Sequence, residues 1–286
     1  MEKWEMERTA IRLGGVELSS SVMNASGPHS AERGEIYELS ARHQGALVFK
    51  SCNVAGLEAP ENLKNRGVEH FAAIARELVP RHKVIIASVV GNTEEEIVKV
   101  AGILDRAGVK IVELNLADDY VMNSVAPFVS YERLKALVGR VRAEIGAALA
   151  IKLPPGPGAI EAKSLADMFK EMGVGVAVCA NDLPKDLEVD AATGRIKGGA
   201  RPLSQAHAFW RLSDGAYDVV AVGGVNSGRD AYVAHLTGAK AVGVGSALIK
   251  EGAGALGRID SELDGMLAEN GKRSVNEIIG QARFES

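Results

Sequence analysis

The chain has 286 residues, of which 47% are hydrophobic and 24% charged, with a formal net charge of −4, an ordinary globular composition. It holds no basic tract, no apolar run near the ~18 residues of a membrane span and no apolar signal segment in MEKWEMERTA, so we expect a cytoplasmic protein that binds neither nucleic acid nor membrane. Cys52 and Cys179 lie far apart without a CxxC spacing, which argues against a disulfide framework and a metal or iron–sulfur site.

The first predicted element is a small N-terminal hairpin. Residues 9–19, TAIRLGGVELS, place Gly14 and Gly15 at its turn. Eight short apolar runs follow and are interpreted as strands, at residues 21–26, 46–51, 84–90, 110–116, 148–153, 174–180, 217–223 and 241–246. Because these runs are almost continuously apolar, they are typical of parallel strands buried on both faces.

Segments with helical periodicity alternate with these strands. They cover residues 67–79, 93–107, 130–145, 161–172, 202–213, 227–237 and 246–253. Thr93 with Glu96 forms the pattern of a capping box, and Ser130 with Glu132 opens the next helix similarly.

This alternation predicts an α/β fold, a (β/α)8 TIM barrel, in one domain that spans residues 1–286. A polar excursion at residues 183–199 predicts a hairpin insertion after the sixth strand. A doubly wound open sheet is the alternative, but the first strand–helix turn, NASGPHS, lacks the GxGxxG fingerprint of that fold.

In such barrels the functional groups gather at the C-terminal ends of the strands. This rule brings together a polar but mostly uncharged set: Asn24, Ala25, Ser26, Gly27, Lys50, Ser51, Cys52, Ser88, Asn115, Asp118, Lys152, Asn181, Gly223, Gly224, Gly245 and Ser246.

The last two strands end in glycine turns, VGGVNSG and VGSALIKEG. Glycine lets backbone N–H groups face a ligand, and the loops after the seventh and eighth strands are the usual phosphate site of this fold. The alternative is that these glycines only close short turns.

Lys50 and Lys152 would point into the barrel mouth, where a lysine needs an anion beside it. A phosphate, a carboxylate substrate or the N1–C2=O edge of a reduced flavin would serve. A salt bridge to a barrel glutamate such as Glu113 is the structural alternative.

Taken together, these residues resemble the dihydroorotate dehydrogenase family of FMN-dependent barrel enzymes. The motifs run in order from about residue 9 to the C-terminus: MNASGP at 23–28, FKS at 49–51, ELNL at 113–116, IKLPP at 151–155, AND at 180–182, GG at 198–199, VGGVNSGRDA at 222–231 and VGSALIKEG at 244–252. The cytosolic first class is the more similar, and its members are usually homodimers. Some members pass electrons to a separate iron–sulfur flavoprotein subunit.

The resemblance implies FMN as cofactor and a role for each matching residue. Ala25, Ser26 and Gly27 would lie along the isoalloxazine ring, with Ser88 also among the cofactor contacts. Lys50, Ser51 and Asn115 would contact flavin, with Lys50 and Asn115 also contacting substrate, and Lys152 would face the flavin N1–O2 edge. The ribityl phosphate would be held by Gly198, Gly199, Gly223, Gly224, Gly245 and Ser246. Asn181 would lie near cofactor and substrate.

The match fails in the substrate half of the site. The family has N-x-S-C-P-N, or Ser for Cys, after the fourth strand, and that Cys or Ser is the base that takes a proton from C5 of dihydroorotate. Here Asp118 occupies the base position and Tyr120 the second Asn position, while Asp182 stands where the family has Ser or Thr. The family's substrate loop N-S-M-G-L-P-N is also absent, with GLEAPEN at 56–62 as the nearest equivalent.

Three hypotheses follow for Asp118. In the first, it is a different base for the same reaction, which requires a raised pKa. In the second, the enzyme oxidises or reduces another small molecule that is less anionic or cationic. In the third, Asp118 and Asp119 are solvated loop residues that cap the helix near residue 123, and the chain binds FMN without this chemistry. A subunit that holds FMN for a partner is the alternative from a different class.

Lys50 and Asp118 are the predicted catalytic residues, and Asp182 is a predicted substrate contact. Cys52 as a reactive thiol and His29 as a replacement base are weaker candidates than a packed thiol and a surface histidine.

Overall fold

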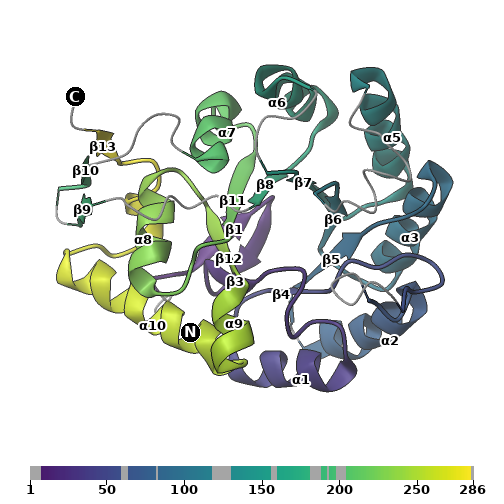
Figure 1. Ribbon diagram of the computed structural model, residues 1–286, viewed down its shortest axis with the longest axis horizontal. Helices are drawn as coiled ribbons and strands as arrows, with labels where there is room; N and C mark the ends of the chain where they lie inside the picture. Colours follow the sequence, from purple (N-terminus) through teal and green to yellow (C-terminus); the bar gives the residue numbers. More distant parts are fainter. Residues whose placement is uncertain are drawn as a thin grey trace, which may run out of the picture.

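The computed structural model describes residues 8–58, 64–81, 83–117, 130–155, 160–180, 188–191, 193–197 and 204–284. Its centre is an eight-stranded parallel sheet with the strand order β3-β12-β11-β8-β7-β6-β5-β4, nearly closed into a barrel and surrounded by helices (Figure 1). The prediction of a (β/α)8 TIM barrel is confirmed, and the doubly wound alternative was wrong because β3 and β12, the first and last barrel strands in the chain, pair with each other.

Each of the eight predicted apolar runs contains one strand of the barrel. These strands are β3 (Val22–Asn24), β4 (Leu47–Val48), β5 (Ile85–Val89), β6 (Ile111–Asn115), β7 (Ala148–Leu153), β8 (Val176–Ala180), β11 (Asp218–Val222) and β12 (Ala241–Val244). Every residue of β5 and β6 is buried, as expected of strands covered by helices on one face and by the barrel interior on the other.

The helices form the outer ring. They are α1 (Arg33–Arg42), α2 (Val68–Leu78), α3 (Glu94–Arg106), α5 (Tyr131–Glu144), α6 (Ala162–Met172), α7 (Gln205–Ser213), α8 (Gly228–Leu236), α9 (Ser246–Glu251) and α10 (Gly254–Glu269), with short 3-10 turns η2 (Val79–Arg81) and η4 (Val275–Glu277). In α2 the apolar face that the periodicity predicted, which includes Phe71, Ile74 and Leu78, is buried. None of the described helices is long and apolar enough to cross a membrane.

The capping box predicted at α3 is only half formed. The Thr93 hydroxyl accepts from the Glu96 N–H, as predicted, at 3.1 Å. The Glu96 carboxylate turns instead to the Asn92 and Val54 N–H groups, at 2.7 and 3.0 Å. It thereby ties the loop after β4 to the start of α3, a long-range contact that competes with the local one.

The gap between β3 and β4 is bridged by a side chain. Asn24, at the end of β3, is fully buried; its Nδ2 donates to Val48 O at 2.6 Å, and its Oδ1 accepts from the Val48 N–H at 2.9 Å. The asparagine amide supplies the donor and acceptor that a backbone ladder would supply. Asn24 therefore closes the barrel seam, which explains an asparagine at a position that the sequence placed at the mouth.

The predicted N-terminal hairpin covers the opposite end of the barrel. Its strands are β1 (Ile11–Leu13) and β2 (Val16–Leu18), and φ is positive at Gly14 (53°) and Gly15 (87°), as a tight hairpin turn requires. The Gly14 N–H donates to the Asp218 carboxylate at 2.8 Å at the first residue of β11. This contact holds the hairpin against the N-terminal ends of the strands, away from the mouth.

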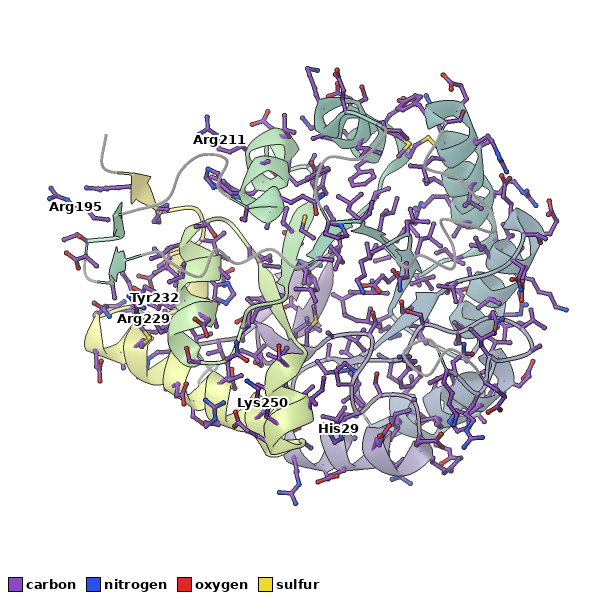
Figure 2. All side chains as sticks on the ribbon, viewed as in Figure 1. His29, Arg195, Arg211, Arg229, Tyr232 and Lys250 are labelled. Carbon is purple, nitrogen blue, oxygen red and sulfur yellow. The ribbon has the colours of Figure 1, made fainter. Side chains whose placement is uncertain are left out.

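The predicted hairpin insertion is present as β9 (Glu188–Asp190) and β10 (Arg195–Lys197), and the C-terminal strand β13 (Arg283–Phe284) pairs with β10. This small sheet lies at the edge of the molecule beyond α8 (Figure 1). Tyr232 of α8 donates its hydroxyl hydrogen to Ala191 O at 3.0 Å, a contact that links the excursion to the barrel; Figure 2 labels Tyr232 and Arg195.

Candidate functional site

The strand order places three predicted ligand loops side by side at the mouth. β3, β12 and β11 are consecutive in the sheet, so the loops that follow them begin at neighbouring points. The Ala25 N–H donates to Val244 O at 2.9 Å, and a Cβ on Gly245 would lie 3.9 Å from the Ala25 Cβ. The residues predicted to line a flavin ring thus adjoin the residues predicted to hold its phosphate.

The glycine turns have the backbone geometry of an anion cradle. Gly223 and Gly224 have φ of 106° and 81°, values that side-chain-bearing residues rarely adopt. Within the described part of the chain, the backbone N–H groups of Gly224, Gly245 and Ser246 donate to no acceptor. Gly224 and Gly245 are partly buried, whereas Ser246 is exposed at the start of α9. N–H groups without a described acceptor on two adjacent turns fit a phosphate group, and they favour the ligand interpretation over simple turn closure.

Lys152 reaches across the mouth. It lies on β7, four strands from β3 in the sheet order, yet its Nζ is 3.2 Å from Ser26 Oγ in the loop after β3. The structural alternative, an ion pair with Glu113, is wrong for Lys152 among the described residues. A partly buried ammonium group above the barrel interior favours an anion or a developing negative charge nearby.

Lys50 lies two residues after β4 and is partly buried. Its N–H donates to Ser30 O at 3.0 Å, and Ser30 Oγ donates in turn to Gly27 O at 3.1 Å. Ser30, which sequence reasoning did not single out, therefore fastens the β3 loop to the end of β4. These two hydrogen bonds fix the position of residues 25–27, predicted to line the flavin ring, relative to Lys50.

Four buried side chains are linked by hydrogen bonds in the barrel interior beside β4, β5 and β6; we call them the polar chain. It consists of Asn115, Ser51, Ser88 and Glu113. Asn115 Nδ2 donates to Ser51 Oγ at 2.7 Å, Ser51 Oγ is 2.9 Å from Ser88 Oγ, and Ser88 donates to Glu113 Oε1 at 2.7 Å. The structure thus joins three predicted cofactor contacts, Ser51, Ser88 and Asn115, to Glu113. The sequence analysis named Glu113 only as a possible ion-pair partner of a lysine.

Register explains why these groups meet. Glu113 pairs with Ser88 of β5, and Asn115, two residues further along β6, pairs with Lys152 of β7. Residues paired in register on parallel strands share a face of the sheet, and residues two apart on one strand share it as well. The same parity rule, applied to the predicted strand, places Glu113 on the same face as Asn115, but its partner Ser88 follows only from the register between β5 and β6.

Cys52 and His29, the weaker candidates for a reactive thiol and a base, lie in surroundings that do not favour catalysis. Cys52 is 1% exposed, and burial raises the pKa of its thiol, so the neutral thiol packs in the core and is not a nucleophile. His29 is partly exposed in the loop that leads into α1, with φ of 52°, and Figure 2 labels it there.

Two cavities that described residues line lie elsewhere. One, of about 1030 Å³, is an open groove whose lining includes Arg8, Arg42 and Asp264. The other, of about 580 Å³, lies beside the N-terminal hairpin and includes Gly14 and Gly175. Neither touches a strand end at the mouth, so neither is the candidate site.

Several predicted site residues lie outside the described residues. They are Asp118, Asn181, Asp182, Gly198 and Gly199. Their predicted roles remain predictions, and the described site consists of Ala25, Ser26, Gly27, Lys50, Ser51, Ser88, Asn115, Lys152, Gly223, Gly224, Gly245 and Ser246.

The glycine turns after β11 and β12 lie where TIM barrels frequently bind phosphate, and Lys152 lies over the same mouth. The family model described as Dihydroorotate dehydrogenase matches residues 53–267, and the chain belongs to this family. Family membership supports an oxidoreductase acting on CH–CH bonds, and family homologues use FMN.

Individual relatives agree with this assignment. A protein of Streptococcus equi subsp. equi, provisionally named dihydroorotate dehydrogenase A (fumarate), is 27% identical over 98% of this chain and 100% of its own. A Streptococcus agalactiae protein of the same provisional name is 25% identical over 95% of this chain and 97% of its own.

Solved structures share the fold. The ligand-free DHODH of Eimeria tenella matches with a TM-score of 0.80 at 16% identity, over 98% of this chain and 93% of that chain. The same protein in complex with ferulenol matches with a TM-score of 0.76 at 14% identity, over 98% and 90%. At these identities the likeness concerns the fold alone.

Proposed function

We propose that this protein binds one FMN non-covalently at the barrel mouth and uses it to oxidise or reduce a small molecule at a CH–CH bond. Bound FMN would supply a hydride acceptor at flavin N5. The observation that carries the proposal is the coincidence, at one mouth, of the glycine cradle on β11 and β12 with Lys152 held over Ser26. Family membership makes FMN the expected occupant of such a cradle.

Different residues would bind the phosphate, the ring and the polar edges of FMN. The N–H groups of Gly224, Gly245 and Ser246 would hold the phosphate, together with Gly198, Gly199 and Gly223. Ala25, Ser26 and Gly27 would line the ring, while Lys50, Ser51, Ser88, Asn115 and Asn181 would contact its polar edges. Lys152 would stabilise negative charge on the reduced ring, because the attraction between an ammonium group and an anion is stronger in a site shielded from water than in bulk water.

For the substrate we propose dihydroorotate, with oxidation to orotate as in pyrimidine synthesis, and with Asp118 as the base in place of the family's Cys or Ser. Lys50, Asn115, Asn181 and Asp182 would contact the substrate. The support is the family assignment together with the retained Lys50 and Asn115.

A second candidate is the same flavin chemistry on a less anionic substrate. It is favoured by the sequence at the substrate positions, where Asp118, Asp119 and Asp182 replace uncharged residues of the family pattern. Carboxylates there would repel dihydroorotate, which is itself a carboxylate. An FMN-binding subunit without this chemistry, serving a partner flavoprotein, is the third outcome.

Anaerobic mixing of the yellow protein with dihydroorotate separates these candidates. Rapid bleaching of the visible flavin band supports the dihydroorotate proposal, and a large loss of that rate in Asp118→Ala supports the base role. A flavin that dithionite bleaches but dihydroorotate does not would reject dihydroorotate as the substrate. Full bleaching by Asp118→Ala at the wild-type rate would reject the base assignment.

We further propose that residues 1–286 act as one domain and that the chain forms a cytoplasmic homodimer. The proposal rests on the family resemblance. Light scattering coupled to size exclusion tests it, since a monomer mass at micromolar concentration would contradict the dimer.

A further inference from the structure

The polar chain ends on a buried acid whose role neither the family match nor the proposed reaction assigns. The exposed fractions of its members are 1% for Asn115, 5% for Ser51, 0% for Ser88 and 4% for Glu113. Burying a carboxylate is costly unless its oxygens accept hydrogen bonds. A carboxylate kept at this depth, two residues below Asn115 on the same strand face, therefore calls for an explanation.

The direction of every hydrogen bond in the polar chain follows from its ends. The Ala117 N–H can only donate, and it donates to Asn115 Oδ1 at 3.1 Å, so the amide oxygen is on that side and Nδ2 faces Ser51. An amide nitrogen only donates, so Ser51 Oγ accepts from it and must direct its own hydrogen to Ser88. Ser88 then directs its hydrogen to the Glu113 carboxylate, which accepts.

Among the described residues, both ends thus impose the same direction, and reversing either hydroxyl group would break one of these hydrogen bonds. If the terminal acceptor is removed, the Ser88 hydrogen loses its partner and can rotate toward Ser51, which then competes with the Asn115 amide. Buried hydrogen bonds in such chains reinforce one another, so the effect extends along the chain.

We propose that Glu113 is a positioning residue that fixes the orientation of the Asn115 side-chain amide through Ser88 and Ser51. The consequence for ligand binding rests on the proposed function: a correctly oriented Asn115 is part of the FMN contact set. Glu113 itself acts from one layer below the mouth and needs no contact with the cofactor.

Three variants separate this role from general packing. Glu113→Gln keeps an oxygen that can accept from Ser88, Glu113→Leu keeps the volume and removes the acceptor, and Ser88→Ala breaks the chain in its middle with a smaller change in shape. Val220→Ala is the matched control, because Val220 is a fully buried barrel residue outside the polar chain.

The first readout needs no flavin. The Asn115 side-chain NH2 signal is observed by NMR in the apoprotein, assigned by its loss in Asn115→Asp. The proposal expects a shifted and faster-exchanging signal in Glu113→Leu and Ser88→Ala, and a wild-type signal in Glu113→Gln and Val220→Ala. A wild-type Asn115 signal in folded Ser88→Ala or Glu113→Leu would overturn it.

The second readout is the Kd for FMN, measured by quenching of flavin fluorescence. Loss of a buried hydrogen bond at the end of the polar chain corresponds to about a tenfold loss of affinity or more in Glu113→Leu, with Glu113→Gln within about threefold of wild type. Equal Kd values in all variants and wild type would overturn the link to ligand binding. If wild type itself takes up no FMN, the proposed function fails, and the NMR readout still decides the positioning role.

Discussion

At the scale of single residues, the contact between Lys152 and Ser26 is the feature of the mouth with the most direct chemical consequence. Lys152 lies on β7 and Ser26 in the loop after β3, four strands away in the sheet order, and their side chains meet at 3.2 Å. The sequence placed Lys152 at the mouth, but its contact with Ser26 depends on the spacing of the two across the barrel, which a strand pattern alone does not reveal.

Replacing Lys152 by Met is expected to keep the length of the side chain and to remove its charge. We expect the rate of flavin reduction by substrate or by a chemical hydride donor to fall by about 100-fold, since removal of one group that stabilises developing negative charge has that effect in other enzymes. The flavin midpoint potential should also become more negative. Lys110→Met, outside the mouth, serves as the control; equal rates in the two variants would remove Lys152 from the mechanism.

His235 should affect the pH dependence of protein stability, and it has no role in catalysis. Its ring is fully buried, with Nδ1 at 2.8 Å from Ala239 O and Nε2 at 3.0 Å from Ser21 Oγ, so Nδ1 carries the hydrogen and Nε2 accepts. Burial lowers the pKa of His235 from 6.5 to about 4. A lowered pKa means that the unfolded chain binds the proton more readily than the folded chain.

The free energy of unfolding should therefore fall as the pH decreases from about 6.5 toward 4, by about 3 kcal/mol from this group alone. Urea unfolding at a series of pH values measures this loss. His235→Gln, which keeps a donor and an acceptor but does not titrate, should be less stable at neutral pH and show a shallower loss. Parallel pH curves for the two proteins would contradict the assignment.

Residue types at the strand ends could be predicted from sequence, because a parallel barrel places every C-terminal strand end at one mouth. Glu113 was named only as an alternative partner for a lysine, and Asn24 only as a mouth residue. Their contacts depend on strand register and on the closing seam, and neither is encoded in a local pattern. Ser30 was missed because nothing in its sequence neighbourhood marks it.

At the scale of elements, the glycine turns after β11 and β12 should carry the phosphate. Gly224→Ala places a Cβ at φ of 81°, which costs about 1–2 kcal/mol of stability, and it crowds the N–H groups of the cradle. We expect the Kd for FMN to rise by at least about tenfold.

Gly215→Ala is the matched control for this change. Gly215 has φ of 77° with open space where its Cβ would lie, and it stands between α7 and β11 at the other end of the barrel. The two variants should lose similar stability in thermal unfolding, and only Gly224→Ala should lose flavin. Equal loss of flavin in both would point to general destabilisation and not to a phosphate site.

Two helices of the ring, α1 and α10, were absent from the sequence-based prediction for different reasons. α1 buries only Ile36 and Leu39, so its apolar stripe is too sparse to stand out. α10 buries Leu256, Ile259, Leu263 and Leu267, a regular stripe that the periodicity contained, but it follows the eighth strand–helix unit and so lies outside the repeat that organised the prediction.

At the scale of the whole molecule, barrel closure depends on Asn24. Asn24→Ala would leave the Val48 N–H and carbonyl without partners at a buried seam. Each buried polar group left unsatisfied costs about 1–3 kcal/mol, so we expect the free energy of unfolding to fall by about 3 kcal/mol. Chemical unfolding measures this loss; a change below about 1 kcal/mol would show that water or backbone movement replaces the amide.

The fold as a whole was predictable because eight buried runs and their alternating helices repeat one pattern. The substrate half of the site was not, because its chemistry rests on the substitutions at Asp118 and Asp182, and a residue type alone does not fix a carboxylate's partner or protonation state. Many residues together determine the fold, the strand register and the glycine turns, whereas a few residues determine substrate specificity.

The stoichiometry of bound FMN is the decisive measurement for the proposed cofactor site. The purified protein is scanned in the visible range, the released cofactor is identified by mass, and apoprotein is titrated with FMN while its fluorescence is followed. We expect one FMN per chain, held without a covalent bond and released on unfolding. A colourless protein whose apo form leaves the fluorescence of added FMN unquenched would contradict it.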